Sequence, residues 1–427
     1  MEYELLSKIF YKKPTEYESI YDARFNSEAS IKLPIKIHEN VGFIFNTNEI
    51  TKLLVKIYKT INKINLLRTH LPNIAINSYI IKSLKDEIAL TNEIEGVRST
   101  RKEIEDAIDS IKNDKSARFK GLVDKYFKLI SNEIIPLNNC EDIRTIYDAL
   151  VLHIGMGCGS RAEDIRTIYD ALVLPEIEKE NLPDGILFRK EPVQVVSATP
   201  KEKHRGIMPE SKIIESLDLC LDFLKSDDID SLIKISAFHY LFGYIHPFYD
   251  GNGRTSRFIS SYLIKNELDV LLALKLSYTV KNNINKYYKA FDVCNDRKNK
   301  GDITFFVVTF LELLSQASDD LYTKIADLND QLNYYNNIIN TLVNEKVLND
   351  KQAKCIFILC QNRLFDDTYM NMNTLTELLE KSDTTTRKIL KSLESKNLLV
   401  KSRNKNQYLY SANLDSLSPQ NFTKCFD

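Results

Sequence analysis

Two apolar segments with a helical period flank one short loop, and this arrangement constrains the fold more than any other feature of the chain. Ile229–Ile245 carries apolar residues at intervals of three and four, and the pattern resumes over Phe258–Leu263. Such segments are expected to pack as helices in a common core. The loop His246–Arg257 must then join two core helices.

The loop between these segments gathers groups that favour phosphate binding. Gly251 and Gly253 let the backbone adopt positive φ and approach a ligand closely, and a helix is expected to begin just after them. Free N–H groups at a helix N-terminus bind anions. Arg254 and Arg257 lie three residues apart, so they share a face and add bidentate donors for phosphate oxygens.

An acid and a potential base complete the loop. Asp250 is unfavourable in an anion site unless a cation neutralises it, and Mg²⁺ prefers one or two carboxylates together with substrate phosphates. Histidine has an intrinsic pKa suited to taking a proton from a hydroxyl, so His246 is a candidate base. A P-loop would be another way to bind a phosphate-bearing ligand, but its GxxxxGK[ST] pattern is absent from the sequence. Each residue alone is more often structural, whereas the combination favours catalysis.

The loop resembles the signature of Fic-domain proteins, HPFx(D/E)GNGRxxR, at every specified position. The resemblance implies transfer of AMP from ATP, the co-substrate, to a Ser, Thr or Tyr hydroxyl of a protein, with Mg²⁺ as cofactor. It implies that His246 deprotonates the hydroxyl, that Asp250 holds the magnesium and that Phe248 anchors the loop. The implied phosphate-binding residues are Gly251, Asn252, Gly253, Arg254 and Arg257, with Arg257 at the γ-phosphate.

An upstream helix carries a second resemblance. Ala75–Glu95 has a helical pattern and stops at Gly96, a favourable C-cap. Its end, Thr91–Gly96, resembles the Fic inhibitory motif (S/T)xxxE(G/N), and Thr91 and Glu95 lie four apart on one face. The resemblance implies that Glu95 pairs with Arg257 and takes the place of the γ-phosphate. A solvated helix end is the structural alternative.

A hairpin precedes the signature at the place of the Fic flap. Residues 192–209 are read as two short strands, Val193–Ser197 and His204–Met208, around a polar turn. The flap borders the active site in that family and holds the target segment by strand addition. The expected docking residues are Val193, Val195, His204 and Gly206. The alternative is an ordinary surface hairpin.

The segment after the signature resembles the family's nucleobase region. Residues 276–306 read as helical with a break at Gly301. Tyr288 and Asn295 lie two helical turns apart, so the first is expected to stack on adenine and the second to hydrogen bond it. A core tyrosine is the rival interpretation.

The chain is therefore predicted to be mainly α, with four regions. Residues 1–115 hold one helix and a turn, a hairpin turning at Asn40–Gly42, and the inhibitory helix of about residues 75–96. Residues 116–315 form the Fic helical core with its β-hairpin flap, and residues 316–347 a helical linker. An identical EDIRTIYDALVL occurs at Glu141–Leu152 and Glu163–Leu174; two copies are too few for a solenoid, and no function is assigned to them.

Residues 348–427 have the pattern of a winged-helix domain. Helices are predicted at Asp350–Cys360, Thr374–Lys381 and Thr384–Asn397, followed by a small hairpin. Basic residues of the third helix and the wing could contact DNA phosphates, although neighbouring carboxylates dilute the positive field and such domains often bind proteins. The basic residues are Arg387, Lys391, Arg403 and Lys405.

Composition limits the compartment and the partners. The net charge of −1 and pI of about 6.6 give no bulk attraction to nucleic acid or to a membrane. Seven scattered cysteines without a CxxC pair favour a reducing compartment and no zinc site. No signal peptide or membrane-length apolar run is evident, so a cytoplasmic protein without a membrane partner is expected. The expected partners are a protein target, the chain itself, DNA at residues 348–427 and a second copy.

Two other functions stay open. Glu95 could activate a water that strips AMP from a modified protein, which product analysis would reveal. The chain could also be a DNA-binding regulator whose Fic core only senses nucleotide, and salt-dependent binding to duplex DNA would favour that reading.

Overall fold

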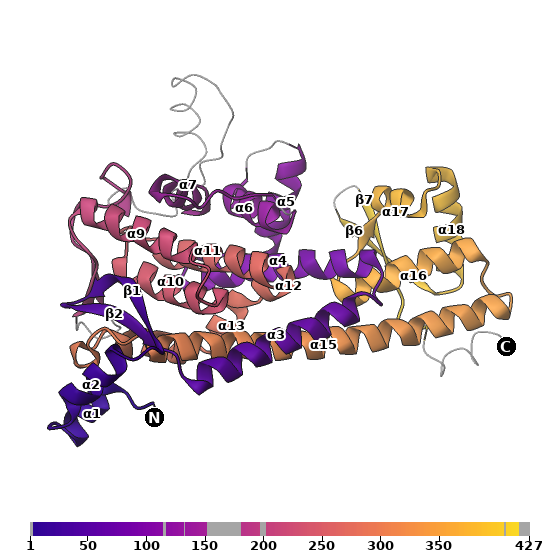
Figure 1. Cartoon of the computed structure of the whole chain (residues 1–427). Helices are drawn as coiled ribbons and strands as arrows, with labels where there is room; N and C mark the ends of the chain where they lie inside the picture. Colours follow the sequence, from indigo (N-terminus) through magenta and orange to yellow (C-terminus); the bar gives the residue numbers. More distant parts are fainter. Residues whose placement is uncertain are drawn as a thin grey trace. The chain divides into compact units, whose positions relative to one another are not determined.

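A computed structural model describes residues 3–113, 117–131, 133–151, 181–196, 202–404 and 407–417. It confirms a mainly helical fold with small antiparallel sheets (Figure 1). The chain divides into two compact units: unit 1 is Met1–Ile61 with Leu84–Asp319, and unit 2 is Asn62–Ser83 with Asp320–Asp427. The divisions fall inside or at the ends of three long helices, α3 (Asn48–Arg68), α4 (Asn73–Ile94) and α15 (Thr304–Asn344). Most of the range predicted as a linker, 316–347, thus belongs to one continuous helix.

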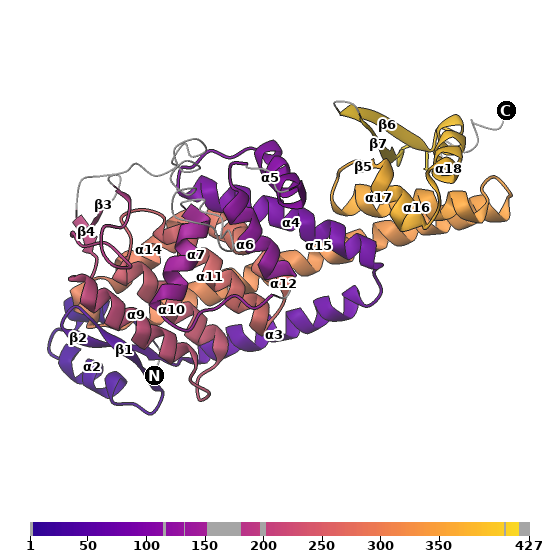
Figure 2. The same cartoon turned by 90° about the horizontal axis from the view of Figure 1, so that it is seen from above.

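The core of unit 1 is built on the two helices that flank the signature loop. Helix α10 (Ser231–Ile245) is buried on nearly all sides, as expected for a helix that is apolar all round. The side chain of Asp230 caps its start by accepting the Leu232 N–H at 2.9 Å. Helix α11 (Asn252–Glu267) lies beside α10, and α9 (Glu210–Leu224) packs on α10 as well (Figures 1 and 2). Helices α12 (Val270–Ala273), α13 (Leu276–Asn282) and α14 (Ile284–Cys294) follow α11.

The N-terminal region differs from the sequence prediction in two places. Two helices, α1 (Leu6–Lys12) and α2 (Tyr17–Phe25), stand where one helix and a turn were predicted. The hairpin of β1 (Ser30–Ile37) and β2 (Asn40–Phe45) is present, but it turns at residues 38–39 and not at Asn40–Gly42. Gly42 lies within strand β2, and a methyl group there would lie 2.9 Å from Leu33 Cδ1. This glycine therefore serves close packing.

Three helices carry the chain from α4 toward the signature. Helix α5 (Arg101–Asn113) opens with a capping box, in which Thr100 N–H donates to Glu103 Oε2 at 2.8 Å and Glu103 N–H donates to Thr100 Oγ1 at 3.2 Å. Helix α6 (Lys120–Ile130) follows it. Helix α7 (Cys140–Val151) contains most of the first EDIRTIYDALVL copy. The second copy, Glu163–Leu174, lies outside the described residues.

The predicted flap is an antiparallel pair of β3 (Gln194–Val196) and β4 (Glu202–Arg205), with Val195 opposite His204. Strand β4 begins two residues earlier than expected and ends at Arg205. It ends there because the Ile207 N–H bonds the Ile245 carbonyl of α10 at 3.1 Å, which draws the chain out of the hairpin.

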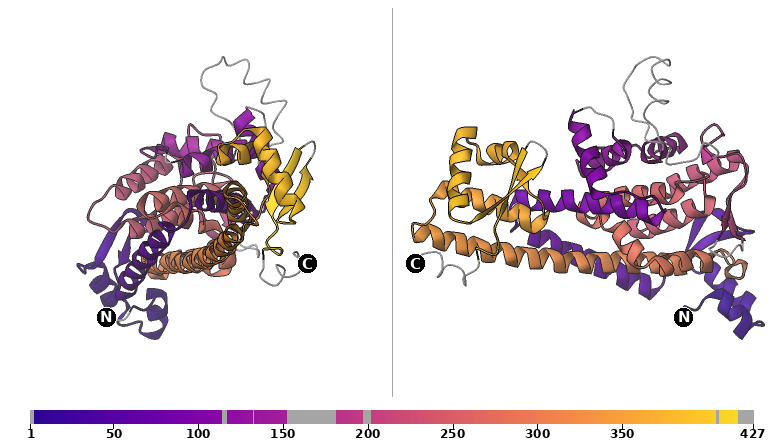
Figure 3. Two further views of the ribbon diagram at one scale, coloured as in Figure 1. Left: turned by 90° about the vertical axis from the view of Figure 1, so that its right-hand side faces the viewer. Right: turned by 180° about the vertical axis from the view of Figure 1, so that it is seen from behind.

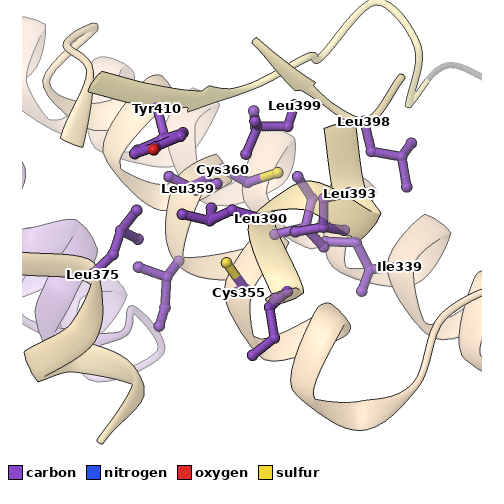
Figure 4. Close-up of a cluster of buried hydrophobic side chains, with 14 of the residues drawn as sticks. Ile339, Cys355, Leu359, Cys360, Leu375, Leu390, Leu393, Leu398, Leu399 and Tyr410 are labelled. Carbon is purple, nitrogen blue, oxygen red and sulfur yellow. The ribbon is translucent and has the colours of Figure 1, made fainter. Parts of the chain in front are cut away.

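Unit 2 contains the three predicted C-terminal helices and a sheet. The helices are α16 (Asp350–Phe365), α17 (Met372–Leu379) and α18 (Asp383–Ser395). Strands β6 (Leu399–Asn404) and β7 (Gln407–Ala412) form the expected hairpin, and a short strand that was not predicted, β5 (Met370–Asn371), pairs with β7 to give the order β5-β7-β6 (labelled in Figure 2). Figure 3 shows the strands of the hairpin in yellow. Leucine side chains from α16, α17 and α18 meet under this sheet in one buried cluster (Figure 4).

Two further observations concern the described part of the chain. None of its helices is both long and apolar enough to span a membrane. Its cysteines are buried and not disulfide-bonded, namely Cys140, Cys220, Cys294, Cys355 and Cys360.

Candidate active site

Phe248 anchors the signature loop in the core, as predicted. Its side chain is fully buried. Its ring stacks on that of Tyr147 from α7, with centroids 3.6 Å apart and planes at 9°. Phe188 meets the same ring edge-on at 5.3 Å. Stacking of this kind adds to area burial and fixes the orientation of the ring, so the loop has a defined floor.

Asn252 closes the loop through a pair of backbone contacts. Its Nδ2 donates to the Phe248 carbonyl at 2.7 Å, and its Oδ1 accepts the Phe248 N–H at 3.0 Å. The side chain that was predicted to cradle phosphate is therefore engaged in shaping the loop. The contribution of Asn252 to an anion site would come from its N–H, since the first N–H groups of a helix have no intrahelical acceptor.

The two signature glycines are required by close contacts. Gly251 has a φ of +79°, and a methyl group there would lie 2.7 Å from Val151 Cγ2. A methyl group on Gly253 would lie 2.1 Å from Glu95 Oε1 and 2.9 Å from Arg257 Nη1. Gly253 therefore allows a carboxylate from α4 to lie directly on the first turn of α11.

The expected ion pair between Glu95 and Arg257 is present. Arg257 Nη2 donates to Glu95 Oε1 at 2.8 Å. The Nε of Arg257 also donates to Thr91 Oγ1 at 3.0 Å, and Nη2 donates to the Thr91 carbonyl at 3.0 Å. The arginine side chain is 1 % exposed and the glutamate 20 %, so the pair is largely shielded from solvent. Helix α4 thus holds the arginine through two residues spaced four apart.

Gly96 ends α4 as the sequence predicted. It has a φ of +74°, and its N–H donates to the Glu93 carbonyl. The Val97 N–H returns to the Asn92 carbonyl at 3.0 Å, as in a glycine-terminated C-cap. The helix therefore ends at Ile94, and Glu95 lies in the turn directly after it.

Buried charges surround the ion pair. Burial works against the charge of Arg257, but Glu95 together with Tyr287 and Tyr288 outweighs it, and the pKa of the guanidinium is raised. Glu87, two turns before Glu95 on α4, is fully buried, and burial raises its pKa to about 7. Its carboxylate accepts the Ser277 N–H at 2.9 Å and the Ser277 hydroxyl at 2.6 Å. Arg254 is buried too, and its charge acts on Tyr147, whose pKa burial raises.

Arg189 holds the start of the signature loop, and the sequence analysis did not identify this residue. Its fully buried guanidinium donates only to carbonyls, through Nε to His246 at 2.8 Å and through Nη1 to Glu191 at 2.8 Å. Nη2 reaches Ile207 at 2.9 Å. One side chain therefore ties the flap base to the signature. In the sequence this residue is a single arginine after the apolar run Ile186–Phe188, and no motif marks it as functional.

His246 lies where the flap and α10 meet. It caps α10 with a φ of 52°, and its N–H donates to the Phe242 carbonyl. A methyl group on Gly206 would lie 3.2 Å from His246 Cβ, and the Gly206 N–H donates to Val193 O at 3.2 Å. The structure thus brings Gly206 to His246, while the side chains of Val195 and His204 lie outside the described residues.

The comparison with known families agrees with this geometry. Residues 139–264 match the model of the Fic/DOC family. The chain therefore contains a Fic/DOC domain. The matched segment covers less than half of the chain and includes the whole signature, whereas Glu95 lies upstream of it. The match supports a nucleotide-transfer function in general terms.

Two solved structures are similar to this chain at low sequence identity. A Fic family protein from Desulfovibrio desulfuricans G20 is 18 % identical, with a TM-score of 0.48, over 86 % of this chain and 96 % of that one. Fic-1 (residues 134–508) from C. elegans is 15 % identical, with a TM-score of 0.43, over 75 % of this chain and 81 % of that one.

The two residues expected at the nucleobase have different neighbours. Tyr288 is 44 % exposed and lies close enough to Glu95 and Arg257 for both charges to act on its pKa, which burial raises. The Oδ1 of Asn295 accepts the Tyr240 hydroxyl at 2.7 Å. Only Tyr288 of this pair is thus linked to the ion pair, and the role of both at adenine stays a prediction.

Asp250 fits a magnesium ion that shares its ligands with a nucleotide. Its Oδ1 accepts the Gly251 N–H at 2.6 Å, which turns the carboxyl toward the start of α11. No group of three or more His, Cys, Asp or Glu side chains in the described ranges could hold a metal. One carboxylate beside a phosphate site is the donor set that Mg²⁺ accepts, because phosphates and waters supply its remaining ligands.

Proposed function

We propose that this chain transfers AMP from ATP to a hydroxyl of a protein side chain, and that Glu95 restrains the reaction. One observation carries the proposal: the Glu95 carboxylate lies on the first turn of α11 and is bonded to Arg257 at 2.8 Å. A helix N-terminus beside a buried arginine is an anion site. An acid that belongs to the chain occupies it, and a phosphate group would compete for the same donors.

The reaction assigns a role to each side chain of the loop. The target hydroxyl attacks the α-phosphorus of ATP while His246 takes its proton. A new oxygen–phosphorus bond forms, the bond between the α-phosphorus and the bridging oxygen breaks, and pyrophosphate leaves. The N–H groups at the start of α11 are placed to stabilise charge on the phosphates. Mg²⁺, held by Asp250, would neutralise phosphate charge when bound.

Restraint follows from competition for Arg257. With Glu95 in place, the γ-phosphate lacks this guanidinium, so ATP would bind with its phosphates displaced. The cost of displacing Glu95 is substantial, because breaking a buried pair costs about 3–5 kcal/mol when one partner is left uncompensated. A γ-phosphate would replace the glutamate as the anionic partner of Arg257 and so offset this cost.

Two labels on ATP test the reaction class. The chain with Glu95→Gly is incubated with magnesium and with ATP labelled at the α-phosphorus or at the γ-phosphorus. AMP transfer predicts that only the α-label enters protein and that pyrophosphate appears in equal amount. Incorporation of the γ-label would identify phosphate transfer instead. Release of AMP from a modified protein by the wild-type chain, which keeps Glu95, would favour the AMP-removing function instead.

A second function is proposed for unit 2, namely binding to duplex DNA. The solvent face of α18 and strand β6 carry exposed cations, and no ion pair joins them to a carboxylate among the described residues. Asp383, four residues before Arg387, and Glu394, three residues after Lys391, lie on the same face of the helix and reduce its positive charge. On β7, the exposed Tyr408 ring lies beneath the Lys401 ammonium, with 4.0 Å to its centroid. The cations are Arg387, Lys388, Lys391, Lys396, Lys401 and Arg403.

Binding of the full chain to a labelled duplex, measured against salt concentration, tests this proposal. Arg387→Ala with Lys391→Ala should weaken binding and lower the slope of log affinity against log salt by about 2. The control removes two exposed lysines of α3, Lys52→Ala with Lys59→Ala, and should leave the slope unchanged. Equal effects of the two pairs, or binding that does not depend on salt, would contradict a DNA interface.

A further inference from the structure

A chain of buried hydrogen bonds leads from Arg257 into the core, in addition to its contacts with Thr91 and Glu95. The guanidinium of Arg257 acts on the Tyr287 hydroxyl of α14 by charge and by a side-chain hydrogen bond. That hydroxyl lies 2.7 Å from His239 Nε2 of α10, and His239 Nδ1 lies 2.8 Å from Ser260 Oγ of α11. All of these side chains are buried. The chain joins three helices of unit 1.

One assignment of donors and acceptors satisfies every group of this chain. Arginine only donates, so the Tyr287 oxygen accepts from Arg257, and its own proton goes to His239 Nε2. In this assignment His239 Nε2 is unprotonated, and Nδ1–H faces two serine hydroxyls, Ser260 Oγ at 2.8 Å and Ser256 Oγ at 3.1 Å. A neutral imidazole meets this requirement, and burial lowers the pKa of His239 to about 3. Each group of the network therefore donates to the next one, starting from Arg257 and passing through Tyr287 to His239.

The two sides of Arg257 have different origins. Thr91, which holds Nε, belongs to α4, and Glu95, which holds Nη2, directly follows the last residue of that helix. Tyr287 and His239 belong to the helices around the signature and do not depend on α4. When a nucleotide displaces Glu95, the arginine loses its carboxylate partner but keeps the tyrosine. The Tyr287 ring is itself fixed by edge contacts with Phe291 at 5.3 Å and Tyr288 at 5.2 Å.

We propose that Tyr287, backed by His239, is a positioning residue that keeps Arg257 directed at the γ-phosphate once Glu95 has left. This inference rests on the proposed function, in which Arg257 meets the γ-phosphate. Its consequence is a selectivity: Tyr287 should contribute to the preference for ATP over ADP, because ADP lacks the group that Arg257 binds. A tyrosine that only fills the core would affect both nucleotides alike.

The test compares ATP and ADP affinity in the full chain carrying Glu95→Gly, with and without Tyr287→Phe. Phenylalanine keeps the ring and its packing and removes the hydroxyl. Loss of a hydrogen bond to a charged group predicts ATP binding weaker by about 10-fold or more, with ADP affinity changed less than about 2-fold. The control is Tyr262→Phe, which removes another buried hydroxyl of α11, bonded to the Ile135 N–H at 3.2 Å, and should change neither.

Substitutions at His239 provide an independent check. His239→Gln keeps an acceptor for the Tyr287 proton and should retain more ATP selectivity than His239→Leu, which keeps none. Equal loss of ATP and ADP binding in Tyr287→Phe, no loss of either, or a Glu95→Gly parent that does not prefer ATP would each overturn the proposal. Failure of AMP transfer in the parent, with selectivity intact, would refute the proposed function and leave this inference standing.

Discussion

Glu87 gives the stability of unit 1 a pH dependence that can be measured. This carboxyl is fully buried on α4 and is bonded to Ser277 through N–H and hydroxyl. Burial raises its pKa from 4.5 to about 7. The substitution Glu87→Gln removes the titration. The glutamine oxygen can accept the Ser277 N–H, and its amide can donate to the Ser277 hydroxyl, so the contacts with Ser277 are kept. The weaker contact of the Tyr126 hydroxyl with Oε1, at 3.4 Å, is lost.

The sign and size of the effect follow from this shift. Because the folded-state pKa is raised, the folded chain holds the proton more tightly than the unfolded chain. The stability that this group contributes is therefore fully present below about pH 4.5 and is lost as pH rises through 7. The shift of about 2.5 units corresponds to about 3 kcal/mol. Glu87→Gln should match wild type near pH 5 and exceed its free energy of unfolding by up to about 3 kcal/mol at pH 8.

Urea unfolding followed by circular dichroism at pH 5 and pH 8 measures this difference. The control is Glu93→Gln, which changes an exposed carboxylate of the same helix that pairs with Lys281 at 3.2 Å. Its pH profile should run parallel to that of wild type. If the Glu87→Gln profile is also parallel to wild type, the reasoning about a buried, protonated Glu87 is wrong.

The remaining predictions concern the ion pair and the loop entrance. Thr91→Val removes the hydrogen bond to Arg257 Nε, and a hydrogen bond to a charged partner is worth about 1.5–3 kcal/mol. This variant should show more AMP self-labelling than wild type but less than Glu95→Gly. Labelling at the wild-type level would contradict a restraining role of Thr91. Gly253→Ala places a methyl group 2.1 Å from Glu95 Oε1 and should disrupt the pair without activating transfer, because the same methyl group obstructs the phosphates; activation equal to Glu95→Gly would contradict this. Arg189→Lys, introduced into Glu95→Gly, loses the fork that holds the carbonyls of residues 246, 191 and 207. It should abolish AMP transfer and speed hydrogen exchange at residues 206–207, whereas unchanged exchange would show that the arginine does not hold the flap.

Local patterns in the sequence predicted those parts of the molecule that depend on neighbouring residues. The helices on both sides of the signature follow from apolar spacing, and the end of α4 follows from Gly96. The pairing of Glu95 with Arg257 was also predicted and is present, although the residues are 162 positions apart. That prediction came from a family resemblance and not from spacing.

Contacts between distant segments could not be read from the sequence. Arg189 meets the signature across 57 positions, and Glu87 meets Ser277 across 190. Neither residue stands in a pattern that distinguishes it from an ordinary surface charge. The turn of the first hairpin was misplaced for a related reason, because the packing of Gly42 on Leu33 is decided by the tertiary structure.

Transfer of labelled AMP from α-labelled ATP in three forms of the chain tests the central claim most directly. The forms are wild type, Glu95→Gly, and Glu95→Gly with His246→Ala, each with magnesium. We expect weak self-labelling in wild type, a strong rise in the single variant and none in the double variant. If Glu95→Gly binds ATP and labels neither itself nor any protein of a cell lysate, the proposed transfer and its restraint by Glu95 are both contradicted.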